Sequence, residues 1–514
     1  MIVPKSVFAH YIVGLTLNQT TDQWKRDIRS ASKASIDGFA LNIGASDHFT
    51  LSSLHTAYEA ASAFDNFSLF LSFDFAGGGF AGSWDVDYIA NLTNTFKDEP
   101  AQFKIDGKPV VSTFEGVDFR ERWMEVRKKV EGGIVFVPDW SSVGPEGLRE
   151  RVGDVDGAFS FDAWPGPSQS QLTTFSDDGY LSALSSSSSS PNGKSVQTDK
   201  IYMMGISPYF YTRLASYNKN WYSSSDTLWP TRLSQALSLS ENSLSDSPRS
   251  PDLLQIITWN DFAESHYISD LVPSQILSEA ESYVNGFDHG GFRAVLPWYV
   301  AAYKLGKTAE EGLTDAEWPK EKLGDGVVSA WYRTTPINIT SEGERKCSDG
   351  GTKWGQQGEK SAKDAVEKDV VNFLAIVRKD TEVVISVEIT GKKVVKQVKK
   401  GGARFFQVGF EELGLGRGNR KGGKVRIEMN GEIREGREVR DECPESGVIN
   451  FNAATVYIAN STHPDTGSDD SGAGSKDGKD DGDEDGDENA ARPGRSVGVT
   501  AALMAFIGFA LFNL

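Results

Sequence analysis

The feature that most constrains the fold is an alternation of short apolar segments with amphipathic segments over the first 310 residues. The apolar segments have the length and composition of buried strands. There are eight of them: Val7–Tyr11, Gly38–Ile43, Leu69–Phe75, Pro109–Phe114, Ile134–Pro138, Ala158–Phe161, Tyr202–Ile206 and Leu254–Trp259. Eight strands alternating with helices over about 300 residues predict an α/β fold of the (β/α)8 TIM-barrel type.

Apolar residues recur at helical spacing between several of these segments. One such segment begins near the candidate cap Thr21 and places Trp24, Ile28 and Ala31 on one face. An open doubly wound sheet is the alternative fold. No G-x-G-x-x-G motif follows the first strand, which counts against a dinucleotide-binding sheet.

The pattern changes near residue 311, where strand-like runs separated by Gly-rich turns replace the helical spacing. The runs are Val327–Tyr332, Val370–Val377, Glu382–Ile389, Arg404–Val408, Lys424–Met429 and Val448–Ile458. We therefore expect a barrel over residues 1–310 and a β-sandwich over residues 311–460. The sandwich either packs against the barrel or binds carbohydrate, and the lack of a row of aromatic residues favours packing.

Residues 182–200 are rich in serine and predict a flexible surface loop between the sixth and seventh strands.

Polar and aromatic residues follow nearly every predicted barrel strand, at the end where barrel enzymes carry their active sites. The aromatic candidates for stacking on a ligand are Trp140, Trp164, Tyr209 and Trp259, and the polar candidates are His10, Asn42, Asp74, Glu115, Asp139, Asp162, Asn260 and His266. For each residue alone, a loop hydrogen bond or ordinary packing is the competing interpretation. The set as a whole favours a polar, sugar-like ligand.

Asp261 and Glu264 follow the eighth strand within Thr258-Trp-Asn-Asp-Phe-Ala-Glu-Ser-His-Tyr267. Two carboxylates are the minimum set for cleaving a glycosidic bond. The same spacing is common on solvated helix faces, but the position at a strand end favours catalysis. The longer side chain favours Glu264 as the proton donor, with Asp261 activating water.

The three-residue spacing raises a geometric difficulty. Inversion of configuration needs the carboxyl groups about 6.5–9.5 Å apart, whereas residues three apart on a helical turn have Cβ atoms only about 5–6 Å apart. Either the turn is irregular, or one acid comes from another strand end, where Asp74, Glu115 and Asp162 are available.

The net charge of −19 excludes nucleic acid as an expected partner, because phosphate backbones are bound by basic patches. Much of this charge lies in residues 461–489, an acidic segment that we expect to be disordered.

Cys347 and Cys443 are the only cysteines, and we expect them to form a disulfide; two buried free thiols are the alternative. No Cys/His cluster has the spacing of metal ligands, so we expect no metal site.

Residues 490–514 have small residues, a short polar spacer and an apolar end, the layout of a GPI-attachment signal. Asn489 is the candidate attachment residue, and a simple tail anchor is the alternative. Such a signal requires entry into the secretory route, yet residues 1–10 lack the basic and apolar regions of a signal peptide. We therefore expect the signal peptide to be missing from this chain. Five Asn-x-Ser/Thr sites are compatible with a secreted glycoprotein: Asn18, Asn66, Asn91, Asn338 and Asn460.

The barrel half resembles glycoside hydrolase family 71, the fungal α-1,3-glucanases or mutanases. The matching motifs cover most of residues 5–310 and include Val7-Phe-Ala-His-Tyr-Ile-Val-Gly14, Ile36-Asp-Gly-Phe-Ala-Leu-Asn-Ile43, Phe136-Val-Pro-Asp-Trp140 and Trp259-Asn-Asp-Phe-Ala-Glu-Ser-His-Tyr267. The resemblance implies endo-hydrolysis of α-1,3-glucan with inversion, without a cofactor, by Asp261 and Glu264.

A secreted, monomeric, lipid-anchored enzyme at the cell surface or cell wall is therefore expected. Two alternatives stay open: a catalytically inactive protein that binds cell-wall glucan, and a barrel hydrolase of another polysaccharide.

Overall fold

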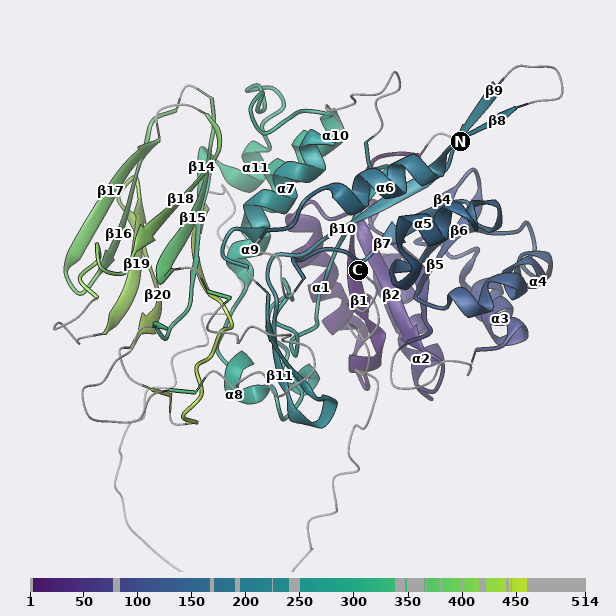
Figure 1. Cartoon of the computed structure of the whole chain (residues 1–514), viewed down its shortest axis with the longest axis horizontal. Coiled ribbons are helices and arrows are strands. Elements are labelled where there is room, and N and C mark those ends of the chain that lie inside the picture. The colour runs from purple at the N-terminus through teal and green to yellow at the C-terminus, as the bar shows by residue number, and fades with distance from the viewer. Residues whose placement is uncertain are drawn as a thin grey trace, which may run out of the picture.

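The computed structural model describes residues 3–459 except 77–83, 167–170, 190–194, 224, 240–249, 338–346, 349–364, 367, 380, 399–400, 416–421, 441–442 and 445. A barrel and a β-sandwich lie side by side (Figure 1). The acidic segment 461–489 and the apolar segment 490–514 lie outside the described residues, as do Asn338 and Asn460.

Eight parallel strands form the barrel: β1 (Ser6–Ile12), β2 (Gly38–Gly44), β3 (Ser68–Asp74), β5 (Lys108–Phe114), β6 (Val135–Asp139), β7 (Gly157–Ser160), β10 (Ile201–Ile206) and β13 (Leu253–Ile256). Each coincides with one of the eight predicted segments. Nearly all their residues are buried, because one face points into the barrel and the other packs under the helices.

The strands follow chain order around the ring, and the ring closes where β13 pairs with β1. The pairing of β3 with β5 completes it, with β4 (Lys104–Ile105) added antiparallel to β5. This closure confirms the barrel and shows that the alternative open sheet is wrong.

Helices cover the outside of the ring: α1 (Thr21–Lys33), α2 (Thr50–Ala61), α3 (Val86–Phe96), α4 (Trp123–Lys129), α5 (Gly144–Arg149), α6 (Phe175–Leu184), α7 (Leu228–Ser238) and α10 (Leu296–Leu305). Helix α1 buries Trp24, Ile28 and Ala31, the face that the spacing predicts. Its cap is Thr20, one residue before the predicted one, because Thr20 and Gln23 form a capping box.

The described parts of the serine-rich insertion contain two strands that the sequence does not predict. Strands β8 (Ser185–Ser189) and β9 (Ser195–Asp199) pair antiparallel between α6 and β10. Backbone hydrogen bonds make such a ladder without any apolar pattern in the side chains, so a composition argument misses it.

A second hairpin, β11 (Tyr211–Leu214) with β12 (Lys219–Tyr222), follows β10 at the same end as the candidate acids. These two strands are not among the predicted ones, since the segments are short and mix charged with aromatic residues.

The sandwich consists of two four-stranded antiparallel sheets. The inner sheet has the order β18 (Gly402–Gly409), β15 (Val370–Val377), β14 (Gly326–Tyr332), β21 (Ala454–Ala459), and the outer sheet has the order β17 (Lys392–Val398), β16 (Val383–Ile389), β19 (Gly423–Met429), β20 (Glu432–Val439). Strands β17 and β20 were not predicted, because they are highly charged edge strands with mostly exposed side chains. Cys347 and Cys443, 96 residues apart, form a disulfide.

The short helix α9 (Gly290–Ala294) packs directly on the inner sheet. A Cβ atom on Gly291 would lie 2.8 Å from both Ser329 Oγ and Thr455 Cβ, so only glycine permits this approach. Ser329 Oγ donates to the Gly291 carbonyl at 2.7 Å. The two halves of the chain therefore share a tightly packed interface.

No helix within the described part of the chain is long and apolar enough to cross a membrane.

A buried ion pair joins helices α6 and α7 on the barrel wall, next to the backbone of Asp162. Arg232 of α7 donates to both carboxylate oxygens of Asp177 of α6 at 2.6 and 2.9 Å, and to the backbone carbonyls of Gly205 and Asp162. Both charged side chains are only 1% exposed.

We predict that Arg232→Met lowers the free energy of unfolding by about 3–5 kcal/mol, because Asp177 would keep a buried charge without its partner. Denaturant unfolding measures the loss. In the exposed pair Arg149–Glu146, Arg149→Met should cost at most about 1 kcal/mol. Equal losses in the two variants would contradict the assignment.

Candidate active site

The loop after β13 folds back on itself and turns both candidate acids inward. Thr258 Oγ1 accepts from the backbone N–H of Asp261 at 2.8 Å, and Asp261 Oδ1 accepts from that of Glu264 at 3.1 Å. The N–H of Thr258 donates to the His266 carbonyl at 2.9 Å, which closes the loop. Because residues 258–266 form turns and not a helix, the side chains of Asp261 and Glu264 converge.

A lysine pairs with one of the two acids. Lys219 Nζ, on β12, lies 2.6 Å from Glu264 Oε1. His266 Nε2 lies 3.1 Å from Glu264 Oε2 and 3.8 Å from Asp261 Oδ2. One ligand atom from each of Asp261, Glu264 and His266 lies within 4.8 Å of the others. We call these three residues and Lys219 the acid cluster.

The two carboxyl groups have opposite pKa shifts. Burial, together with the charge of Glu264, raises the pKa of Asp261 to about 6. Burial also opposes ionisation of Glu264, but Lys219 and His266 together outweigh it and lower the pKa of Glu264 to about 2. At pH 5, Asp261 therefore holds a proton while Glu264 is ionised, which is the division of states that acid–base catalysis requires.

The acid cluster is enclosed. Asp261 is 0% and Glu264 1% exposed. The indole of Trp164, which is partly exposed, stacks on His266 with ring centroids 5.5 Å apart and on Phe210 at 4.9 Å. Trp164 is thus a partly exposed aromatic ring in direct contact with the buried acid cluster.

Other carboxylates gather at the ends of β3, β5, β6 and β7. Burial raises the pKa of Glu115, to which Asp162 and Asp74 also contribute, and burial together with Glu115 and Asp162 raises that of Asp139 well above its usual range. Glu115 has a left-handed φ of 56°, and its carboxylate accepts from Ser142 N at 2.9 Å. Strained backbone of this kind is commonest at functional sites. Asp74, Glu115, Asp139 and Asp162 form a second group of acids, here called the β3–β7 acids.

Buried polar atoms of three candidate residues have no hydrogen-bond partner among the residues that the structure describes: Asn42 Nδ2, Asp139 Oδ2 and Asp261 Oδ2. Buried polar atoms are rarely left unpaired, so these three are suited to bind ligand hydroxyl groups.

His10 points into the barrel. Its Nδ1 lies 2.8 Å from Gln255 Nε2, and its ring lies 5.5 Å from that of Phe161 on β7. Burial, with a smaller effect of His266, lowers the pKa of His10 to about 3, so this ring is neutral.

Four candidates make contacts away from the acid cluster. Trp259 packs between Phe39 and Arg293, and Trp140 packs on Phe136 under the helices. Asn260 bonds the backbone N–H and carbonyl of Ile12, which joins the acid loop to β1. Tyr209 donates to the carbonyl of Phe451, shortly before β21, at 2.8 Å. These contacts are structural, and they leave Trp164 as the aromatic candidate that touches the acid cluster.

Lys219 and Thr258 also belong to the site, although neither is among the predicted site residues. Thr258 is the first residue of the acid motif, so its position there is a usable signal. Lys219 is one lysine among many, on an unpredicted hairpin, and no sequence signal distinguishes it.

Asp261, Glu264 and His266 present a set of atoms that could hold a metal ion. The Lys219 ammonium already neutralises one carboxylate at 2.6 Å, so the arrangement fits an ion pair better than a divalent cation.

Comparison with known proteins gives a consistent result. The model of Glycosyl hydrolase family 71 matches residues 3–468. Glucan endo-1,3-alpha-glucosidase agn1 of Schizosaccharomyces pombe is 36% identical over 66% of this chain and 72% of its own length. A mutanase of Penicillium rubens is 32% identical over 66% of this chain and 68% of its length. The ascus wall endo-1,3-alpha-glucanase of S. pombe is 28% identical over 66% of this chain and 74% of its length.

The opposite pKa shifts predict opposite effects on stability. A carboxyl whose pKa is raised by folding destabilises the fold at pH values above that pKa, because it is then charged in an unfavourable environment. Asp261→Asn should therefore raise the free energy of unfolding at pH 7 by roughly 2–3 kcal/mol. At pH 4 Asp261 is protonated in the folded protein, so the gain should be much smaller. Glu264→Gln should lower it by about 3–5 kcal/mol, because Lys219 would be buried without its partner. Denaturant unfolding at the two pH values tests both. Destabilisation by both variants at pH 7 would contradict the assigned charges.

Proposed function

Because the chain belongs to glycosyl hydrolase family 71, we propose that this glycoside hydrolase cleaves α-1,3-glucan internally, with Asp261 and Glu264 as catalytic carboxylates. The observation that carries the proposal is the buried acid pair after the eighth barrel strand, with one pKa of about 6 and the other of about 2. The names of the two S. pombe relatives supply the linkage.

In this proposal Asp261 is the general acid. It holds a proton at weakly acidic pH, and it gives this proton to the glycosidic oxygen as the bond to the anomeric carbon breaks. The ionised Glu264 then stabilises the positive charge that develops on the sugar. Side-chain length favours the reverse assignment, but Lys219 opposes protonation of Glu264.

Inversion also requires a carboxylate that removes a proton from the attacking water. Asp261 and Glu264 present oxygens within 4.8 Å of each other, which is closer than the roughly 6.5–9.5 Å that accommodates a water molecule. We therefore assign water activation to the β3–β7 acids, among which Asp74, Glu115 and Asp162 are the candidates. Trp164, His10 and Asn42 complete the sugar site.

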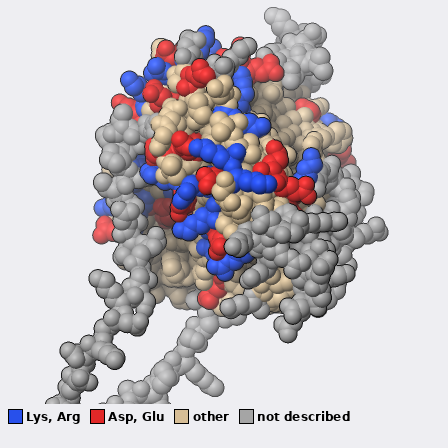
Figure 2. Space-filling view, turned by 90° about the vertical axis from the view of Figure 1, so that its left-hand side faces the viewer, with Lys and Arg blue, Asp and Glu red and all other residues tan. Residues whose placement is uncertain are grey.

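The two alternatives have less support. A sugar-binding role of the sandwich has little support, since the four strands of the outer sheet contain no aromatic residue. Figure 2 shows this face covered by interspersed basic and acidic side chains. An activity measurement distinguishes cleavage from a barrel that only binds glucan. Hydrolysis of a different polysaccharide is the second alternative, and a panel of glucan substrates tests it.

The proposed place of action is outside the cell, at the cell wall, with a lipid anchor at Asn489. The disulfide fits an oxidising compartment, and the three described glycosylation sites, Asn18, Asn66 and Asn91, are exposed. Release of the protein from intact cells by a phospholipase specific for phosphatidylinositol is the expected result, and retention would contradict the anchor.

On a panel of α-1,3-, α-1,4- and β-1,3-glucans, we predict release of oligosaccharides from the α-1,3-glucan alone. Asp261→Asn should reduce the rate by about 10²–10⁴-fold, the usual contribution of a general acid, while sedimentation with insoluble α-1,3-glucan persists. NMR of the first products should show β-anomers. The matched control is Asp98→Asn at an exposed carboxylate, which should retain full activity. Cleavage of another glucan, or full activity of Asp261→Asn, would contradict the proposal.

A further inference from the structure

The β11–β12 hairpin holds Glu264 at two points. The backbone N–H of Tyr211, at the start of β11, donates to the Glu264 carbonyl at 3.1 Å. Lys219, at the start of β12, pairs with the Glu264 carboxylate at 2.6 Å. The position of this hairpin therefore determines where the ammonium group meets the carboxylate.

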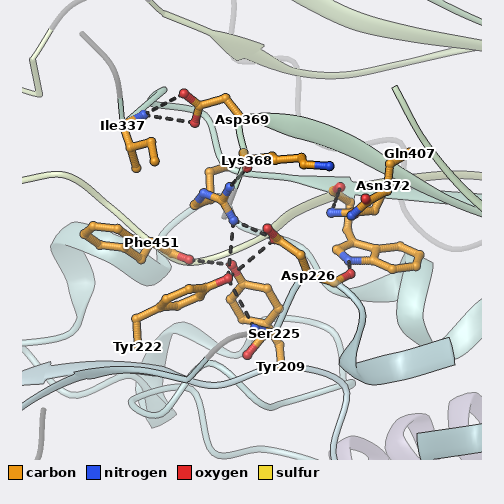
Figure 3. Close-up of polar contacts among 12 residues, drawn as sticks. Tyr209, Tyr222, Ser225, Asp226, Ile337, Lys368, Asp369, Asn372, Gln407 and Phe451 are labelled. Carbon is orange, nitrogen blue, oxygen red and sulfur yellow. Dashed lines mark hydrogen bonds and ion pairs between the residues drawn. The ribbon is translucent and has the colours of Figure 1, made fainter. Parts of the chain in front are cut away.

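The other end of β12 is held by the sandwich (Figure 3). Arg333, which directly follows β14, donates through Nη1 to Asp226 Oδ1 at 2.5 Å and to the Tyr222 hydroxyl at 3.3 Å. Trp331 Nε1 donates to the Asp226 carbonyl at 3.1 Å. Tyr222 is the last residue of β12, three residues from Lys219.

Arg333 is itself fixed within the sandwich. Its side chain is 2% exposed, and Nη2 donates to the Lys368 carbonyl at 2.6 Å. The carbonyl of Trp331 accepts from Asn372, which in turn accepts from Gln407 on β18. A surface ion pair would give only a little stability. This arginine is buried and makes several hydrogen bonds, so it holds Asp226 and Tyr222 in fixed positions.

Phe451, in the segment that leads into β21, supports the same hairpin. Its ring lies 5.6 Å from that of Tyr211 and 5.5 Å from that of Tyr222, so both strands rest on it. Ser223, just after β12, donates to the Pro165 carbonyl at 2.7 Å, next to Trp164. The hairpin thus connects the sandwich with the acid cluster and with the residue next to Trp164.

On the basis of the proposed function, we propose that Arg333 of the sandwich is a positioning residue for hydrolysis: through Asp226 and Tyr222 it holds β12 so that Lys219 meets Glu264. The sandwich then contributes to the chemistry without touching the substrate.

The groups that face Glu264 determine how its pKa would change if the hairpin moved. Lys219 comes from β12, Asp261 and His266 come from the same loop, and His10 of β1 lies near His266. Burial and Asp261 disfavour the ionised form of Glu264, whereas Lys219 and His266 favour it. If β12 moves, the ammonium withdraws and Glu264 becomes protonated at higher pH.

The test is the pH profile of kcat/KM on α-1,3-glucan for the full chain, with Arg333→Met, Lys219→Met and the double variant. In the wild type, Glu264 is ionised throughout the accessible pH range. In each single variant we expect a new loss of activity on the acidic side, with a midpoint at least one pH unit above any acidic limb of the wild type. The double variant should match Lys219→Met, since both changes act on one group.

Asp226→Asn keeps the side-chain size and the backbone contact with Trp331, so it tests the same link if Arg333→Met does not fold. The matched control is Ser329→Ala, which removes another hydrogen bond across the interface, to Gly291, and should leave the profile in place. A drop in kcat/KM that is uniform across pH in Arg333→Met or Asp226→Asn would overturn the inference. An inactive wild type would instead overturn the proposed function.

Discussion

The ion pair between Lys219 and Glu264 is the interaction on which the candidate site depends. Two carboxylates with oxygens less than 5 Å apart cannot both stay ionised at low cost in a buried site. The ammonium group resolves this conflict by favouring the charged form of one acid, and the proton that remains is held by Asp261. Lys219, together with His266, thereby gives two similar side chains different protonation states.

This arrangement draws on both halves of the chain. The barrel supplies the acid loop after β13, while the hairpin that carries Lys219 is supported by Arg333 of the sandwich and by Phe451, which precedes β21. The four described strands of the outer sheet carry charges of both signs and no aromatic residue. In barrel enzymes the loops at the strand ends carry the active site. In this chain the second domain also contacts one of those loops and holds it in place.

The eight barrel strands could be predicted from the sequence because each is a short apolar run buried on both faces, and the acid pair because it directly follows one of them. Strands β17 and β20 could not, since exposed edge strands carry charges in place of an apolar alternation. Lys219 could not be found because its role arises only when a hairpin folds over the acid loop. Trp140 and Trp259 show the limit of position alone: each follows a strand end, yet the contacts of its ring are with Phe136 and with Phe39 and Arg293, not with the acid cluster.

The most direct test is a crystal structure of the Asp261→Asn variant with a bound α-1,3-linked gluco-oligosaccharide. The account predicts a glycosidic oxygen about 3 Å from the side chain of residue 261, Lys219 still paired with Glu264, and Trp164 moved from its place over His266 onto a sugar ring. An oligosaccharide bound elsewhere, with Trp164 still stacked on His266, would contradict it.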